Sequence, residues 1–102
     1  MTVLVARFKQ SPSEVRRYVI DYTLQMSPGE TITTIVPTIS SPTGGNLNLV
    51  VANIAIASSG LQAVFYVSGG QINQSYEIDF VTTTSIAQTF EDVVQIDIAG
   101  KV

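Results

Sequence analysis

The stretch that decides the fold is Ser68–Thr84, with the sequence SGGQINQSYEIDFVTTT. From Tyr76 onward its apolar residues recur at every second position, and acidic residues stand between them. A period of two is typical of a strand with one buried face and one solvated face. The pair Gly69-Gly70 precedes this strand, and glycine readily adopts the positive φ angles of a tight reversal. The stretch therefore predicts the end of one strand, a glycine turn and a long amphipathic strand.

The same alternation recurs along the rest of the chain. Runs rich in β-branched and aromatic residues are separated by turn residues, at the spacing typical of sandwiches and barrels. We predict about seven strands in an all-β fold, over Val3–Phe8, Val15–Leu24, Thr31–Ile39, Leu47–Ala57, Leu61–Val67, Tyr76–Thr84 and Phe90–Ile98. The length of 102 residues suits one domain, so we expect a single β-sandwich domain over residues 1–102.

The composition is poor in charge. Apolar residues make up 45% of the chain and charged residues only 13%, whereas about 25% is typical. Low surface charge is common in assembly subunits, and a surface of Ser, Thr, Asn and Gln is the alternative interpretation. The net charge of −3 argues against nucleic acid and anionic membranes as partners. Apolar runs such as Leu49–Ala52 are too short for a membrane span, and the first residues lack the features of a signal peptide.

The charges are unevenly distributed. Residues 1–45 carry four basic and three acidic residues, whereas residues 46–102 carry one basic and five acidic residues. Such a split would help identical subunits meet head to tail, and chance in so small a count is the simpler explanation.

The residue types exclude most catalytic chemistry. The chain has no cysteine and no histidine, which rules out disulfides, thiolate nucleophiles, zinc sites of the usual kind and imidazole acid–base chemistry. Glu77 and Asp79 share a strand face and form the one carboxylate pair worth weighing, although a solvated polar face explains them better. The glycine pairs lack the lysine of a phosphate-binding loop. We therefore expect a protein that is not an enzyme, with no catalytic residue, no cofactor and no metal site.

Three segments leave alternatives open. Ser11–Glu14 has the pattern of a helix start, but the following alternation over Val15–Leu24 favours at most one helical turn and then a strand. A helix from Ser13 to about Tyr22 is the alternative. Pro37 cannot donate to a ladder, so its strand is an edge strand or is broken there. The run Leu47–Ala57 carries aliphatic residues on both faces, which indicates a strand that is central in a sandwich or is buried against another subunit.

Several residues are candidates for an interface rather than for chemistry. The pair Arg16-Arg17 forms a basic spot, joined by Arg7 and Lys9 if the first two strands pair. Tyr66 falls opposite Phe65 in the alternation and is the best candidate for an exposed aromatic residue. The interface candidates are Arg16, Arg17, Ile54, Ile56 and Tyr66.

Several short motifs resemble those of small virion proteins of tailed bacteriophages. In the first half these motifs are Ser11–Val15 (SPSEV), Tyr18–Tyr22 (YVIDY) and Ser27–Ile32 (SPGETI). In the second half they are Val67–Gly70, Ser75-Tyr76, Thr82–Thr84 and Val94–Ile98. The chain departs from that group at Tyr22, Phe65 and Tyr66, in places where tryptophan is common.

The resemblance implies a fold and a function. It implies an immunoglobulin-like antiparallel β-sandwich. Independently of the resemblance, the position of Tyr76 at a strand start suits a corner hydrogen bond of the kind found in such sandwiches. It implies a non-enzymatic structural protein of the virion, assembled in the host cytoplasm, that joins tail or neck components and seats fibers. The implied partners are other virion proteins of the tail, neck or capsid and further copies of the same chain. The alternatives are a capsid decoration protein and a host-surface carbohydrate-binding module anchored on Tyr66.

Overall fold

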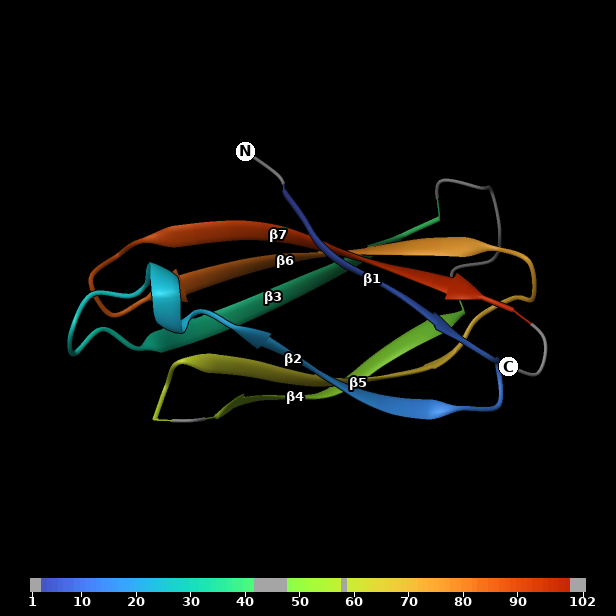
Figure 1. Cartoon of the computed structure of the whole chain (residues 1–102), viewed down its shortest axis with the longest axis horizontal. Helices are drawn as coiled ribbons and strands as arrows, with labels where there is room; N and C mark the ends of the chain where they lie inside the picture. The colour runs from blue at the N-terminus through green and yellow to red at the C-terminus, as the bar shows by residue number, and fades with distance from the viewer. Residues whose placement is uncertain (1–2, 42–47, 58, 100–102) are drawn as a thin grey trace.

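The computed structural model describes residues 3–41, 48–57 and 59–99 (Figure 1). Within them the predicted alternation becomes seven strands, and the one helical element is a single 3-10 turn, η1 (Thr23–Gln25). The strands are β1 (Val3–Gln10), β2 (Val15–Asp21), β3 (Ile32–Ser40), β4 (Leu49–Ala57), β5 (Gln62–Gly69), β6 (Ser75–Thr84) and β7 (Thr89–Ile98).

The strands form two packed sheets, with the orders β1-β7-β6-β3 and β2-β5-β4 (Figure 1). The second order, and β7-β6-β3 in the first, match the B-E-D and G-F-C strands of an immunoglobulin sandwich. This confirms the predicted β-sandwich. One pair departs from antiparallel order, because β1 joins the four-stranded sheet beside β7 and runs parallel to it.

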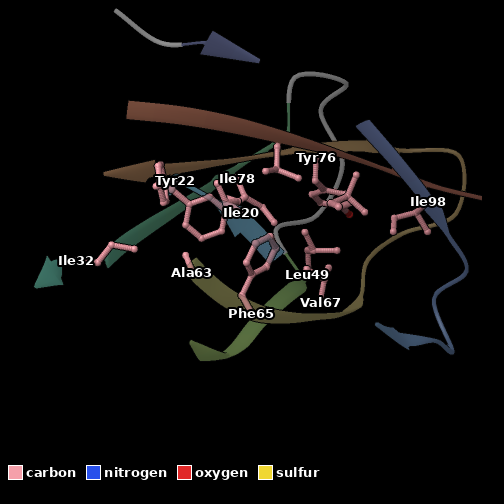
Figure 2. Close-up of a cluster of buried hydrophobic side chains, with 13 residues drawn as sticks. Ile20, Tyr22, Ile32, Leu49, Ala63, Phe65, Val67, Tyr76, Ile78 and Ile98 are labelled. Carbon is pink, nitrogen blue, oxygen red and sulfur yellow. The ribbon is translucent and has the colours of Figure 1, made fainter. Parts of the chain in front are cut away.

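Strand β6 lies at the centre of the core. Tyr76, Ile78 and Phe80 on β6 are fully buried and point into the space between the sheets (Figure 2 labels the first two). The rings of Phe80 and Phe65, one from each sheet, have centroids 4.6 Å apart. The buried cluster is completed by Ile20, Tyr22, Ile32, Leu49, Ala63, Val67, Val94, Ile96 and Ile98.

The glycine turn and the tyrosine corner are both as predicted. Gly69 and Gly70 have φ angles of +75° and +93°, the left-handed region that favours glycine. Behind them the Tyr76 hydroxyl accepts a hydrogen bond from the Gln71 backbone N–H at 2.9 Å and donates to Asn48 Oδ1 at 3.2 Å. These bonds hold the connection between β5 and β6 against the start of β6, as in the tyrosine corner of immunoglobulin-like folds.

The segment around β2 is a strand, as the alternation favoured. Glu14 Oε1 accepts a hydrogen bond from the Ser11 N–H at 2.8 Å, which is half of a capping box. The turn stops there, and β2 begins at Val15. The prediction was wrong at the other end, because Leu24 lies in η1 rather than on the buried face of β2. The strand ends at Asp21, whose carboxylate accepts a hydrogen bond from the Thr23 N–H and so bends the chain.

Two expectations about strand neighbours need correction. Of the two interpretations of the run Leu47–Ala57, the central strand is wrong, because β4 is an edge strand of the three-stranded sheet, and burial against another subunit stays a prediction; Leu47 lies outside the described residues. The first two strands do not pair, because β1 lies beside β7 and β2 beside β5. Pro37 is on the edge strand β3, which confirms the expectation that proline marks an edge. In the described ranges no helix is long and apolar enough to cross a membrane.

Candidate interaction surfaces

The outer face of the three-stranded sheet is unusually apolar. Since Ala63, Phe65 and Val67 of β5 face the core, Val64 and Tyr66 face outward. The register places Val19 and Ala55 beside Val64, Arg17 and Ala52 beside Tyr66, and Val15 and Val50 beside Ser68. We call this surface the valine face, after Val15, Val19, Val50 and Val64. Three of these valines are exposed, and Val64 at the centre is buried.

The outer face of the four-stranded sheet is polar by contrast. Its polar residues are Glu77 and Asp79 from β6, Glu91, Gln95 and Asp97 from β7, and Thr38 and Ser40 from β3, and the valines Val36, Val81 and Val93 stand between them. Val36 is its exposed valine. The predicted pairing of Glu77 with Asp79 on one face is therefore correct. Among the described residues, no three acidic side chains are arranged to hold a metal ion.

Asp79 on this polar face lies in an environment that is unfavourable for its charge. Its Oδ1 atom is buried and has no hydrogen-bond partner in the described part of the chain. Burial first, and then the neighbouring charges of Glu91, Asp92 and Glu77, raise the pKa of Asp79. The charged form of this side chain therefore opposes folding slightly at neutral pH.

The predicted basic spot is divided. Arg16 forms an exposed ion pair with Glu14 at 2.6 Å, and Arg7 forms one with Asp97 at 2.8 Å. The Ser11 N–H first, and then Arg16, lower the pKa of Glu14. Arg17 lies beside Tyr66 on the valine face. Tyr66 is half-buried there, so it is less exposed than the sequence suggested.

Ile54 and Ile56 lie at a different place, on the free edge of β4. A bulge at Asn53, with a φ angle of +52°, shifts the register between Ala52 and Ala55. Together with the neighbouring edge strand β3 this forms a groove of about 270 Å³, which we call the edge groove. It is lined by Thr33, Thr34, Ile35, Ile54, Ala55 and Ile56. Two of the five interface candidates thus line the edge groove, and Arg17 and Tyr66 share the valine face.

A buried carboxylate joins two turns at one end of the sandwich. Glu30 is almost fully buried, and it accepts hydrogen bonds from the Thr84 hydroxyl, the Ser27 N–H at 2.8 Å and the Gln88 side-chain amide at 2.9 and 3.0 Å. The sequence identified Glu30 only as a turn residue, because its partners Thr84 and Gln88 lie 54 and 58 positions away. The bonds from Thr84 and Ser27 lower the pKa of Glu30, against the opposing effect of burial.

This carboxylate predicts a pH dependence. A carboxyl group with a lowered pKa in the folded state stabilises above its ordinary value of 4.5, and this contribution is lost as the pH falls towards the folded-state value. The variant Glu30→Gln should therefore be less stable than the wild type at neutral pH, and the difference should shrink below about pH 4.5. Urea unfolding of both proteins at neutral and acidic pH measures it. A difference that stays constant with pH would contradict this role of the charge.

Together the fold and these surfaces define a class of protein: a small β-sandwich with exposed apolar surfaces that are candidates for binding other proteins. The comparison with protein families is more specific. The model described as "Podophage GP4 fiber-tail adaptor protein gp77" matches residues 10–97, and the chain belongs to this family. No curated protein sequence matches it.

Membership of this family fixes the general function. The chain is a structural, non-enzymatic component of the phage virion, and it connects fibers to the tail. The family that the short motifs predicted is thereby confirmed, and so is the choice of a tail adaptor as the leading function. Its partners are tail and fiber proteins.

Proposed function

We propose that this adaptor contacts a tail or fiber protein through the valine face, and that it does so as one of several identical copies of a single 102-residue domain. The observation that carries the proposal is the contrast between the two outer faces. One presents mainly valines, alanines and a tyrosine, whereas on the other Val36, Val81 and Val93 are interspersed with carboxylates, threonines and an amide.

A contiguous apolar surface on a soluble domain marks an interaction site, whereas single exposed valines need no explanation. Val15 and Val50 flank Ser68 across three adjacent strands, and Val19 and Ala55 flank Val64 two positions along. The surface is therefore continuous from one edge of the sheet to the other.

Arg17 and Tyr66 support a protein partner for this face. Tyrosine and arginine are enriched among the residues that dominate protein–protein binding energy. Arg17 and Tyr66 are paired across β2 and β5, with valines on either side. Arg16 is held by Glu14 at the rim, where we expect a smaller contribution. The net charge of −3 fits protein partners better than nucleic acid or an anionic membrane.

The test replaces one exposed valine by glutamate on the outer face of each sheet. Val50 on β4 is 49% exposed and Val36 on β3 is 55% exposed, and both belong to edge strands. We expect Val50→Glu to lower incorporation of the adaptor into particles at least about tenfold, because a carboxylate would be buried without a partner. Val36→Glu should leave incorporation unchanged. The amount of adaptor in purified particles made with each variant measures this.

A second variant, on another strand of the valine face, tests whether the loss of incorporation is confined to changes in β4. Val19→Glu on β2 should reproduce the loss, and thermal unfolding should show that all three variants remain folded. Normal incorporation of the folded Val19→Glu and Val50→Glu variants would overturn the assignment of the valine face. Adaptor located on the capsid by electron microscopy would favour the decoration alternative, and Tyr66-dependent glycan binding would favour the carbohydrate one.

A further inference from the structure

One large apolar side chain is almost completely exposed. Leu24 in η1 is 98% exposed, and its neighbours Thr23, Gln25 and Met26 carry no charge. An isolated exposed leucine is ordinary on a flexible loop. The unusual feature of Leu24 is that both ends of its connection are anchored in the core.

The anchors come from buried polar groups. Before η1, the Tyr22 side chain is buried. Its hydroxyl donates a hydrogen bond to Asp92 Oδ2 at 2.7 Å and lies 3.1 Å from Thr82 Oγ1. After η1, the buried Glu30 carboxylate is bonded to the Ser27 N–H and to Gln88. The connection between β2 and β3 is thus held at both ends, and Figure 1 shows η1 standing at the end of the sandwich. A projecting group held in place loses little entropy on binding.

The edge groove of the same chain matches such a group in size and polarity. The edge groove of about 270 Å³ is lined by three isoleucines, one alanine and two threonines, and by no charged residue. A cavity of about 150 Å³ holds a benzene molecule, so the groove has room for a leucine side chain. Neither Leu24 nor the groove would bring a charge that has to be desolvated on contact.

The two surfaces do not meet within one molecule, because Leu24 is 98% exposed. We propose that Leu24 of one copy docks in the edge groove of a second copy, against Ile54 and Ile56. This inference rests on the proposed assembly of identical copies, and the edge groove shares only Ala55 with the valine face. Because the projection and the groove are different surfaces, the contact is either made twice in a two-fold dimer or repeated head to tail in a ring or a filament.

The absence of cysteine allows a direct test. Purified full-length Leu24→Cys is mixed with Ile56→Cys, each with a different tag, and treated with a short bismaleimide cross-linker. We expect the mixed dimer in several-fold excess over the mixed dimer formed by Leu24→Cys and Ile72→Cys. Ile72 is a matched control, since it is 49% exposed and Ile56 is 43% exposed.

Sedimentation of the uncross-linked protein completes the test. The wild type should self-associate with rising concentration, and Leu24→Asp should stay monomeric. Ile86→Asp, a change of another exposed aliphatic residue, should behave as the wild type. Equal cross-linking to positions 56 and 72, or a wild type that is monomeric at all concentrations, would overturn the proposal. The Val50→Glu variant should leave the cross-linking and the sedimentation results unchanged. A failure of the Leu24 contact is therefore distinguishable from a failure of the proposed contact through the valine face.

Discussion

Replacing Phe80 by alanine is expected to lower the free energy of unfolding by about 3–5 kcal/mol, the usual cost of removing a buried phenylalanine. Phe80 is 0% exposed and lies on β6, between β7 and β3 in the four-stranded sheet. Its ring packs against Phe65 of the opposite sheet, with centroids 4.6 Å apart. The variant would therefore leave a cavity between the two layers. Since small domains have a total stability of about 5–15 kcal/mol, this single change should leave the fold marginal.

Urea unfolding followed by circular dichroism measures this loss. Phe90→Ala is the matched control, because Phe90 is only partly buried and packs at the margin of the core beside Tyr22, with ring centroids 5.5 Å apart. It should cost clearly less than Phe80→Ala. A loss below about 1 kcal/mol for Phe80→Ala would mean that the two sheets do not pack as described.

Replacing Gly70 by alanine should have the second largest effect. At a φ angle of +93° the change imposes a conformation that costs an L-residue about 1–2 kcal/mol. The added Cβ would also lie 2.8 Å from Ile98 Cγ1 in the core, and overpacking of this kind costs about 1–3 kcal/mol more. The expected total is about 2–5 kcal/mol.

A substitution at Gly29 separates the cost of the positive φ angle from the cost of the close contact with Ile98. It has a φ angle of +81°, and a Cβ there would meet no atom within 4 Å. Gly29→Ala should therefore show the conformational cost alone. Thermal unfolding of both variants gives the comparison. Equal losses at the two positions would show that the contact with Ile98 is not tight.

The strands were predictable from local pattern, and their neighbours were not. Tyr76, Ile78 and Phe80 alternate with polar residues, so their burial follows from the period of a strand. The position of β4 at an edge depends on which strands pair, and such pairing joins residues far apart in the sequence. The parallel placement of β1 beside β7 is of the same kind. Leu24 was misassigned because a local hydrogen bond to Asp21 ended the alternation.

The candidate surfaces were predictable in part. Ile54 and Ile56 stood out because β4 is apolar on both faces, but the bulge at Asn53 that makes the edge groove has no clear sequence signal. The valine face had a signal in Val19, an apolar residue on the outward side of its strand, between Arg17 and Asp21. Its extent was hidden, because Val15, Val50 and Val64 come from three strands that only the sheet brings together. The role of Glu30 required the fold for the same reason.

The most direct test of the central claim is an electron-microscopy map of the assembled tail in which this chain is traced. The account predicts that a tail or fiber protein covers the valine face, around Tyr66 and Val50, and that the polar face around Glu77 stays in solvent. A map in which the polar face is covered and the valine face is open would contradict it.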